Sequence, residues 1–280
     1  MRFSDGNIFK RIFASDISSI RTELSGNIFP GESSSGEVPA AGDRKGTMEL
    51  IIAPRNIGEP ARDYAYRVLS ENIAKLKLYP GCPLNDQEVA VRLGISRTPV
   101  REAINQIKNE SDIIEIYPQR GMKISLIDTG IINQVRDLRV MLEKRSMRLC
   151  CKNRSEEDLK WMDDNVALQN FYFERGEVQT AMEQDDLLHR KIFEIAGMEY
   201  IHRMTRGLML QYNRVRVLET FYDSYGDSIN DHQAIVDAIR QQEPRAVEKL
   251  VDVHLGRWVD NERKLRKQYP EYFLEEVNEK

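Results

Sequence analysis

The stretch "GISRTPVREAI", residues 94–104, decides the fold because it combines the end of one helix with the start of the next. Gly94 readily adopts the positive φ that ends a helix. Ser96 or Thr98 offers a side-chain oxygen suited to a helix N-cap, and Pro99 follows in the first turn, where its missing N–H costs nothing. The stretch therefore predicts two helices joined by a tight turn.

The second of these helices has one apolar face and one basic face. Its apolar residues recur at i, i+3, i+4 and i+7, the spacing of a buried helix face: Val100, Ala103, Ile104 and Ile107. Arg97 and Arg101 lie off this face, one turn apart, near the start of the helix. Two arginines in this arrangement suit phosphates and guanine edges in the major groove of DNA. A capped surface helix with ordinary charges would show the same short pattern.

Two more helices are predicted upstream of this stretch. Residues 66–76 place apolar side chains on one helix face, and Pro80-Gly81 then signals a turn. Asn85 and Glu88 have the spacing of a capping box, which starts a short helix that ends at Gly94. Together with the basic helix, they predict a helix-turn-helix.

A β-hairpin is predicted directly after the basic helix. Two β-prone runs, residues 113–116 and 122–125, flank a turn that contains Pro118 and Gly121. Such a hairpin is the wing of a winged helix, and Arg120 at its tip is placed to touch the DNA backbone or the minor groove.

Residues 64–125 resemble the winged helix of GntR-family bacterial transcription regulators. The matching segments are Pro80–Leu84, Glu88–Ala90, Leu93–Ala103 and Arg120–Gly121. The resemblance implies that the DNA contacts come from the start of the recognition helix and from the wing, at Ser96, Arg97, Thr98, Arg101, Arg120 and Gly121.

This segment departs from the family pattern at two places. Gln87 stands where many members have arginine, which removes one expected DNA contact. Residues 110–113 replace the usual Gly-Leu corner between the recognition helix and the wing. Ser111 or Asp112 must therefore make this turn without the conformational freedom of glycine.

The remainder of the chain is predicted to be an all-helical bundle. Asp128 can cap its first helix, and breaks at Arg154-Ser155 and Arg175-Gly176 enclose a second. Four more helices are expected over residues 177–196, 199–222, 228–240 and 244–266, with a break at Tyr225-Gly226-Asp227. The sequence thus predicts a mainly α protein in which a winged helix precedes a six-helix bundle.

All four histidines of the chain lie in this helical half. Asp185 and His189 share a helix face one turn apart, and Asp186 is an alternative acid for the same position. His232 begins the predicted fifth helix and His254 lies on the sixth. A carboxylate and three imidazoles that meet inside a bundle suit a divalent ion such as Zn, Ni or Mn. For a single helix histidine, hydrogen bonding or exposure is the commoner role, and His202 is assigned to that class.

Residues 128–266 resemble the FCD effector domain of the FadR subfamily. The matches are Arg139-x-x-Leu142-Glu143, Asp185-x-x-x-His189, His232-x-x-Ile235 and His254. The resemblance implies that Asp185, His189, His232 and His254 bind a metal ion, and that Arg139 helps to bind an anionic effector. Arg139 could equally form a buried salt bridge with Glu143, four residues along.

Length, charge and composition divide the chain into three parts. The 280 residues carry a net charge of −4, but residues 62–125 hold ten basic and eight acidic side chains, so charge permits DNA binding without requiring it. Residues 1–56 are predicted to be a disordered leader, residues 57–125 the DNA-binding domain and residues 126–280 the effector and metal-binding domain. With no apolar run of 18 residues and only three cysteines, the chain is expected in the cytoplasm and off the membrane.

Three functions fit these features. The first is a transcriptional repressor that binds a two-fold symmetric operator in double-stranded DNA as a homodimer and senses a small organic acid at a metal-containing pocket. The second is a regulator for which the metal ion is itself the signal. The third is a metal-dependent enzyme, although the sequence shows no motif for a nucleophile or a base. Metal content and effector-dependent release of DNA would separate the three.

Overall fold

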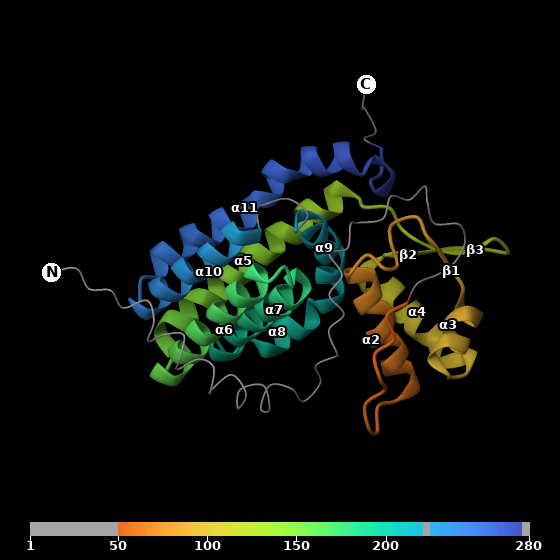
Figure 1. Ribbon diagram of the computed structural model, residues 1–280, viewed down its shortest axis with the longest axis horizontal. Coiled ribbons are helices and arrows are strands. Elements are labelled where there is room, and N and C mark those ends of the chain that lie inside the picture. Colours follow the sequence, from red (N-terminus) through yellow and green to blue (C-terminus); the bar gives the residue numbers. More distant parts are fainter. Residues whose placement is uncertain (1–49, 221–224, 276–280) are drawn as a thin grey trace. The chain divides into compact units, whose positions relative to one another are not determined.

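The structure, a computed structural model, describes residues 50–220 and 225–275 (Figure 1). Most of the predicted leader therefore lies outside the described residues. Its last part, residues 50–56, is described and packs on the first helix of the winged helix. There the Asn72 side chain accepts a hydrogen bond from the backbone N–H of Ile51 and donates one to the Ile51 carbonyl.

The predicted winged helix is confirmed, and its sheet has one more strand than the predicted hairpin. Its helices are α2 (Ala61–Ala74), α3 (Asp86–Leu93) and α4 (Arg97–Ser111). Its strands are β1 (Pro83–Leu84), β2 (Ile114–Tyr117) and β3 (Gly121–Ile124), in the antiparallel order β1-β3-β2. The additional strand, β1, was missed because it is two residues long and directly follows the predicted Pro-Gly turn.

The local signals around α3 and α4 act as the sequence predicts. The Asn85 side chain caps α3 by accepting hydrogen bonds from the backbone N–H groups of Gln87 and Glu88. Gly94 ends α3 with a φ of 63°. Ser96 is the N-cap residue of α4, but its side chain makes no capping hydrogen bond. Pairing of the strands around the turn then builds the wing, with Tyr117 opposite Gly121.

The corner between α4 and the wing uses Asp112 in place of glycine. Asp112 adopts a left-handed conformation with a φ of 53°, and its N–H donates to the Lys108 carbonyl. Short polar side chains such as aspartate tolerate this region better than most residues. The apolar face of α4 is buried, as the spacing predicts, at Val100, Ala103, Ile104 and Ile107.

The helical half contains seven α-helices in the described part of the chain, one more than predicted. They are α5 (Thr129–Asn153), α6 (Glu156–Glu174), α7 (Val178–Ile195), α8 (Glu199–Met204), α9 (Arg206–Glu219), α10 (Tyr225–Arg240) and α11 (Pro244–Gln268). The single helix predicted over residues 199–222 is wrong, because Thr205 separates α8 from α9. The predicted break at Tyr225-Gly226-Asp227 is also wrong, because these residues form the first turn of α10.

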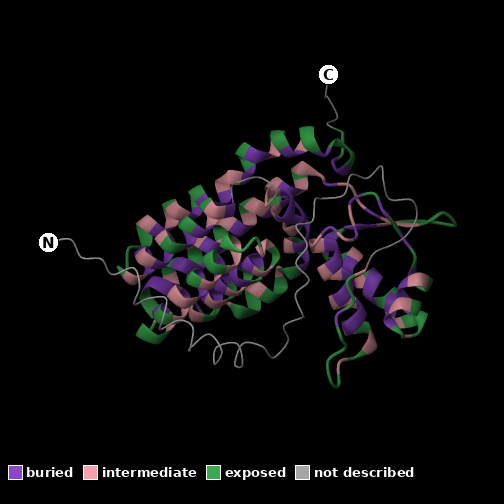
Figure 2. Cartoon of the chain, in the orientation of Figure 1, coloured by how far each residue is buried: buried purple, intermediate pink, exposed green. Residues whose placement is uncertain are grey.

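Buried side chains line the helix faces that point into the bundle (Figure 2). Trp258 of α11 is fully buried, and its indole N–H donates to Asn133 Oδ1 on α5 at 2.9 Å. A short 3₁₀ helix, Pro270–Tyr272, returns the chain to the start of the bundle. There the Ile127 N–H donates to the Tyr272 carbonyl at 2.8 Å. None of the described helices has a long enough apolar stretch to cross a membrane.

Helix α9 connects the bundle to the recognition helix α4. The Gln211 side chain donates to the Ser111 carbonyl at the end of α4 at 2.6 Å. Arg214, which is fully buried, donates to the Ser125 carbonyl at 2.8 Å. Gly207 lies so close to α4 that a Cβ added there would come within 2.6 Å of the Glu110 Cβ. The absence of a side chain at this position therefore permits the two helices to pack.

Candidate metal centre and DNA interface

The two arginines of α4 share one carboxylate. Arg97 donates from Nε and Nη2 to the two oxygens of Asp86, at 2.8 and 2.7 Å. Arg101 donates from Nε to Asp86 Oδ2 at 2.6 Å. The Arg97 hydrogen bonds outweigh burial and lower the pKa of Asp86. Asp86 is not among the residues predicted from the sequence, although it directly follows the Asn85 cap in the first turn of α3.

All six residues predicted to contact DNA lie at the surface of the winged helix. Ser96, Arg97, Thr98 and Arg101 are exposed at the start of α4, whereas Arg120 and Gly121 are exposed at the tip of the wing. Arg120 N–H donates to the Tyr117 carbonyl, which closes the turn between β2 and β3. These residues are therefore accessible to a ligand as large as a DNA duplex.

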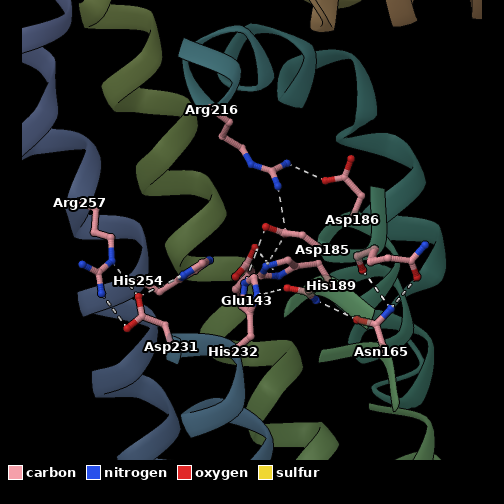
Figure 3. Close-up of polar contacts among 12 residues, drawn as sticks. Glu143, Asn165, Asp185, Asp186, His189, Arg216, Asp231, His232, His254 and Arg257 are labelled. Carbon is pink, nitrogen blue, oxygen red and sulfur yellow. Dashed lines mark hydrogen bonds and ion pairs between the residues drawn. The ribbon is translucent and has the colours of Figure 1, made fainter. Parts of the chain in front are cut away.

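Three histidines from three helices meet inside the bundle (Figure 3). His189 lies on α7, His232 on α10 and His254 on α11, and all three are buried. One ring nitrogen from each lies within 4.8 Å of the others. His232 was predicted at the start of its helix, but α10 begins earlier, at Tyr225. His202 lies outside this group, with its ring against Phe193.

Each of the three imidazoles has an oxygen beside its Nδ1 atom. His232 Nδ1 lies 2.7 Å from Gln169 Oε1, and His189 Nδ1 lies 3.2 Å from Glu143 Oε1. His254 Nδ1 lies 3.5 Å from Asp231 Oδ2. Oxygen partners on one ring nitrogen orient an imidazole and favour metal binding through the other nitrogen. This arrangement is typical of histidines that hold a metal ion.

Asp185, rather than Asp186, is the acid that joins the cluster. Its Oδ1 lies 3.4 Å from His189 Nε2, and its Oδ2 lies 3.9 Å from His232 Nε2. Asp186 is exposed and pairs with Arg216 at 2.6 Å. Helix geometry left both acids open, and burial of the α7 face that carries His189 decides between them.

Several buried polar atoms of the cluster have no hydrogen-bond partner among the described residues. They include Nε2 of His189 and Nε2 of His232. Nδ1 of His189 and Oδ1 of Asp185 also miss hydrogen-bond geometry, although each faces a charged group, Glu143 at 3.2 Å and Arg216 at 3.0 Å. Unsatisfied polar atoms are costly in a protein interior and are rarely left without a ligand or water. Imidazole nitrogens and a carboxylate oxygen are a donor set that divalent transition metals accept. The residues therefore fit a metal ion.

The charges of the cluster are those that a metal ion requires. Burial lowers the pKa of His232 well below its usual value, and it also lowers the pKa of His254. Burial would raise the pKa of Asp185, but Arg216 and the imidazoles reverse this and hold it low. These directions favour neutral imidazoles at His232 and His254 and an ionised carboxylate at Asp185, the forms that bind metal.

Two arginines lie beside the cluster, the buried Arg139 and the partly buried Arg216. Arg139 donates from Nε to Glu143 Oε1 at 2.5 Å, which is the salt bridge that sequence analysis held open as an alternative to effector binding. Arg216 of α9 lies with Nη2 at 3.0 Å from Asp185 Oδ1. Arg216 is not among the predicted site residues, because spacing within α9 does not indicate which of its polar residues faces α7.

Comparison with known proteins agrees with both halves of this description. Residues 62–124 match the gntR family of bacterial regulatory proteins, and residues 134–257 match the FCD domain. The HTH-type transcriptional repressor RspR of Escherichia coli is 28% identical over 231 residues, which cover 82% of this chain and all of RspR.

Two further similarities extend over much of the chain. A "Probable D-xylose utilization operon transcriptional repressor" of Paenarthrobacter nicotinovorans is 22% identical over 67% of this chain and 82% of its own length. The structure of E. coli McbR/YncC has the same fold, with a TM-score of 0.65 at 17% identity, over 75% of this chain and 99% of that one. The family and these relatives are transcriptional regulators rather than enzymes. The chain therefore belongs to the GntR family of bacterial transcriptional regulators and has a helix-turn-helix domain of the GntR type followed by an FCD domain.

Proposed function

We propose that this regulator is a cytoplasmic, FadR-like repressor whose affinity for its operator depends on a small carboxylate bound at a divalent metal ion in the FCD domain. The observation that carries the proposal is the pair of buried ring nitrogens, Nε2 of His189 and Nε2 of His232, that make no hydrogen bond within the described chain and lie beside the Asp185 carboxylate. A bundle core rarely holds such a set unless a ligand completes it.

Asp185, His189, His232 and His254 would hold the ion, which would be Zn, Ni or Mn. When bound, the ion supplies positive charge that attracts an oxygen of an anionic effector. Glu143, Gln169 and Asp231 orient the imidazoles from the far side of each ring. Arg139, positioned by Glu143, adds a guanidinium close to the same centre.

The winged helix would bind DNA through α4 and the wing. Arg97 and Arg101 would read base edges, Ser96 and Thr98 would contact the backbone beside them, and Arg120 with Gly121 would support the complex from the wing. A single winged helix offers little surface, so we infer a homodimer on a two-fold symmetric operator. The names of RspR and of the D-xylose operon regulator support repression.

Helix α9 offers a route from the FCD domain to the DNA-binding domain. Arg216 of α9 contacts Asp185 in the FCD domain, and Gln211 of the same helix donates a hydrogen bond to the Ser111 carbonyl at the end of α4. An effector changes DNA affinity only if it binds one arrangement of the protein better than the other. A change in the contacts of Asp185 would reach α4 through this helix.

A second candidate is a regulator that responds to the metal ion alone. One observation favours it: the two guanidinium groups beside the cluster in the described chain are already paired, Arg139 with Glu143 and Arg216 with Asp185 and Asp186. Neither is held ready for an organic anion.

One titration separates these candidates. The wild-type protein first selects its own binding sequence from a randomised DNA library, and its affinity for that duplex is then measured by fluorescence anisotropy with chelator, with metal, and with metal plus a panel of small carboxylates. The first proposal expects a carboxylate to change the affinity only in the presence of metal. A change caused by metal alone would establish the second candidate, and no response in any arm would contradict both. Light scattering at micromolar concentration tests the dimer.

A further inference from the structure

The carboxylate of Asp86 is the centre of the exposed arginine pair. Its side chain is only 7% exposed, whereas those of Arg97 and Arg101 are 48% and 60% exposed. Three hydrogen bonds of 2.6–2.8 Å connect it to the two guanidinium groups. A buried, fixed acceptor thus holds two long side chains that would otherwise sample many rotamers.

These hydrogen bonds leave a defined part of each guanidinium free. Arg97 uses Nε and Nη2, and Arg101 uses only Nε. Since a guanidinium has five N–H donors in a rigid plane, fixing Nε also fixes the direction of the remaining donors. Within residues 50–220 and 225–275, the Nη1 atom of Arg97 and both Nη atoms of Arg101 have no acceptor, so they are available for another one.

The position of Asp86 at the start of α3 stabilises its negative charge. Asp86 occupies the first turn of α3, where the helix dipole favours a negative charge, and the Asn85 cap precedes it. The pKa of Asp86 is lowered, chiefly by hydrogen bonding from Arg97, so the carboxylate is ionised at neutral pH.

We propose that Asp86 is a positioning residue for operator recognition, which orients Arg97 and Arg101 so that their free donors meet defined base edges. This inference rests on the proposed DNA interface of α4. Asp86 itself is too buried to read a base. Its contribution is therefore to sequence preference, because a preorganised guanidinium discriminates between bases better than a mobile one.

Electrostatics separates this role from a merely structural one. A carboxylate next to DNA repels phosphates, so its removal strengthens binding to DNA of any sequence. Loss of arginine positioning weakens binding to the preferred sequence alone. The variant Asp86→Asn should therefore weaken binding to the preferred sequence without weakening binding to other DNA, whereas a damaged fold would weaken both.

The experiment compares two duplexes of equal length, one with the sequence that the wild type selects from randomised DNA and one with the same bases shuffled. For Asp86→Asn we expect the ratio of the two affinities to fall by about fivefold or more, with unchanged or tighter binding to the shuffled duplex. Glu88→Gln is the matched control, because it removes the same charge from the same turn of α3, where Glu88 pairs with Arg92 instead. The control should keep the wild-type ratio.

The possible outcomes distinguish an error in the role proposed for Asp86 from an error in the proposed DNA interface of α4. If Arg97→Ala and Arg101→Ala lose the selected duplex while Asp86→Asn keeps the wild-type ratio, the inference is overturned and the interface stands. If both arginine variants bind like the wild type, the interface itself is wrong and the inference falls with it. Equal weakening on both duplexes by Asp86→Asn would assign this residue to the fold alone.

Discussion

The two arginines of the winged helix and the three histidines of the bundle are held by different means. Arg97 and Arg101 share a carboxylate that lies nearby in the chain, and their free donors face solvent. The histidines come from α7, α10 and α11, and they are oriented by side chains of α5, α6 and α10. In addition, Nε2 of His189 and Nε2 of His232 are buried and make no hydrogen bond to any described residue.

This difference affects how the polar atoms of each site are satisfied when no ligand is bound. An exposed guanidinium is hydrated when no DNA is bound, so the free protein pays little to keep it. A buried imidazole nitrogen without a partner has no such compensation. The bundle site should therefore depend on its ligand more strongly than the winged helix does.

The largest expected effect is that substitutions at each site impair the function of that site and leave the other site unchanged. Arg97→Ala or Arg101→Ala should weaken binding to the selected duplex by about 1–3 kcal/mol and leave metal content unchanged. His254→Ala should lose the metal and any effector response but retain DNA binding. Anisotropy and elemental analysis on the same preparations check both results. Loss of both properties in either variant would mean that the sites are not separate.

A second prediction uses two acids whose pKa values change in opposite directions. Burial raises the pKa of Glu219 to about 7, whereas hydrogen bonding from Arg97 lowers that of Asp86. A carboxyl with a raised pKa stabilises the fold below its unfolded pKa and loses that contribution as pH rises through 7. Glu219→Gln should therefore raise the free energy of unfolding at pH 8 by on the order of 1–3 kcal/mol, and change it little near pH 4.

Asp86→Asn serves as the opposite case for this measurement. A carboxyl with a lowered pKa stabilises the fold above its unfolded pKa, so this variant should be the less stable one at pH 8. The oxygen of a glutamine at position 219 can still accept the hydrogen bond from Asn261 Nδ2. Urea unfolding at the two pH values is the measurement, and a Glu219→Gln protein less stable than wild type at pH 8 would contradict the assignment.

The smallest effect concerns the packing of α9 on the recognition helix. Gly207→Ala places a methyl group 2.6 Å from the Glu110 Cβ and 3.0 Å from its carbonyl oxygen, so it should cost about 1–3 kcal/mol of stability. Gly256→Ala is the control in α11, because its new Cβ meets nothing within 4 Å and alanine favours a helix by up to about 1 kcal/mol. Thermal unfolding should move in opposite directions, and equal shifts would contradict the close contact.

Local sequence patterns predicted much of the fold and, at each site, the residues that lie close together in the chain. The Asn85 cap, the Gly94 stop and the apolar face of α4 each depend on neighbours within a few residues. The pairing of Asp185 with His189 is likewise one helical turn. Such features are readable because chain geometry alone brings the residues together.

The partners that were missed depend on contacts between elements. Asp86 reaches the arginines across the turn, Arg216 reaches Asp185 from another helix, and Gln169 reaches His232 from a third. Spacing along a single helix contains no information on these distances. The break between α8 and α9 was also missed, because the residue at the break, Thr205, is neither a glycine nor a proline.

The amount of bound metal is the most direct test of the proposed metal site in the bundle. The wild-type chain, the His232→Ala variant and the His202→Ala variant are reconstituted separately with Zn, Ni and Mn, desalted and analysed for bound metal by elemental analysis. We expect stoichiometric uptake of a divalent ion by the wild type and by His202→Ala, whose histidine lies outside the cluster, and none by His232→Ala. Absence of uptake by the wild type, or a loss in His202→Ala as complete as in His232→Ala, would contradict it.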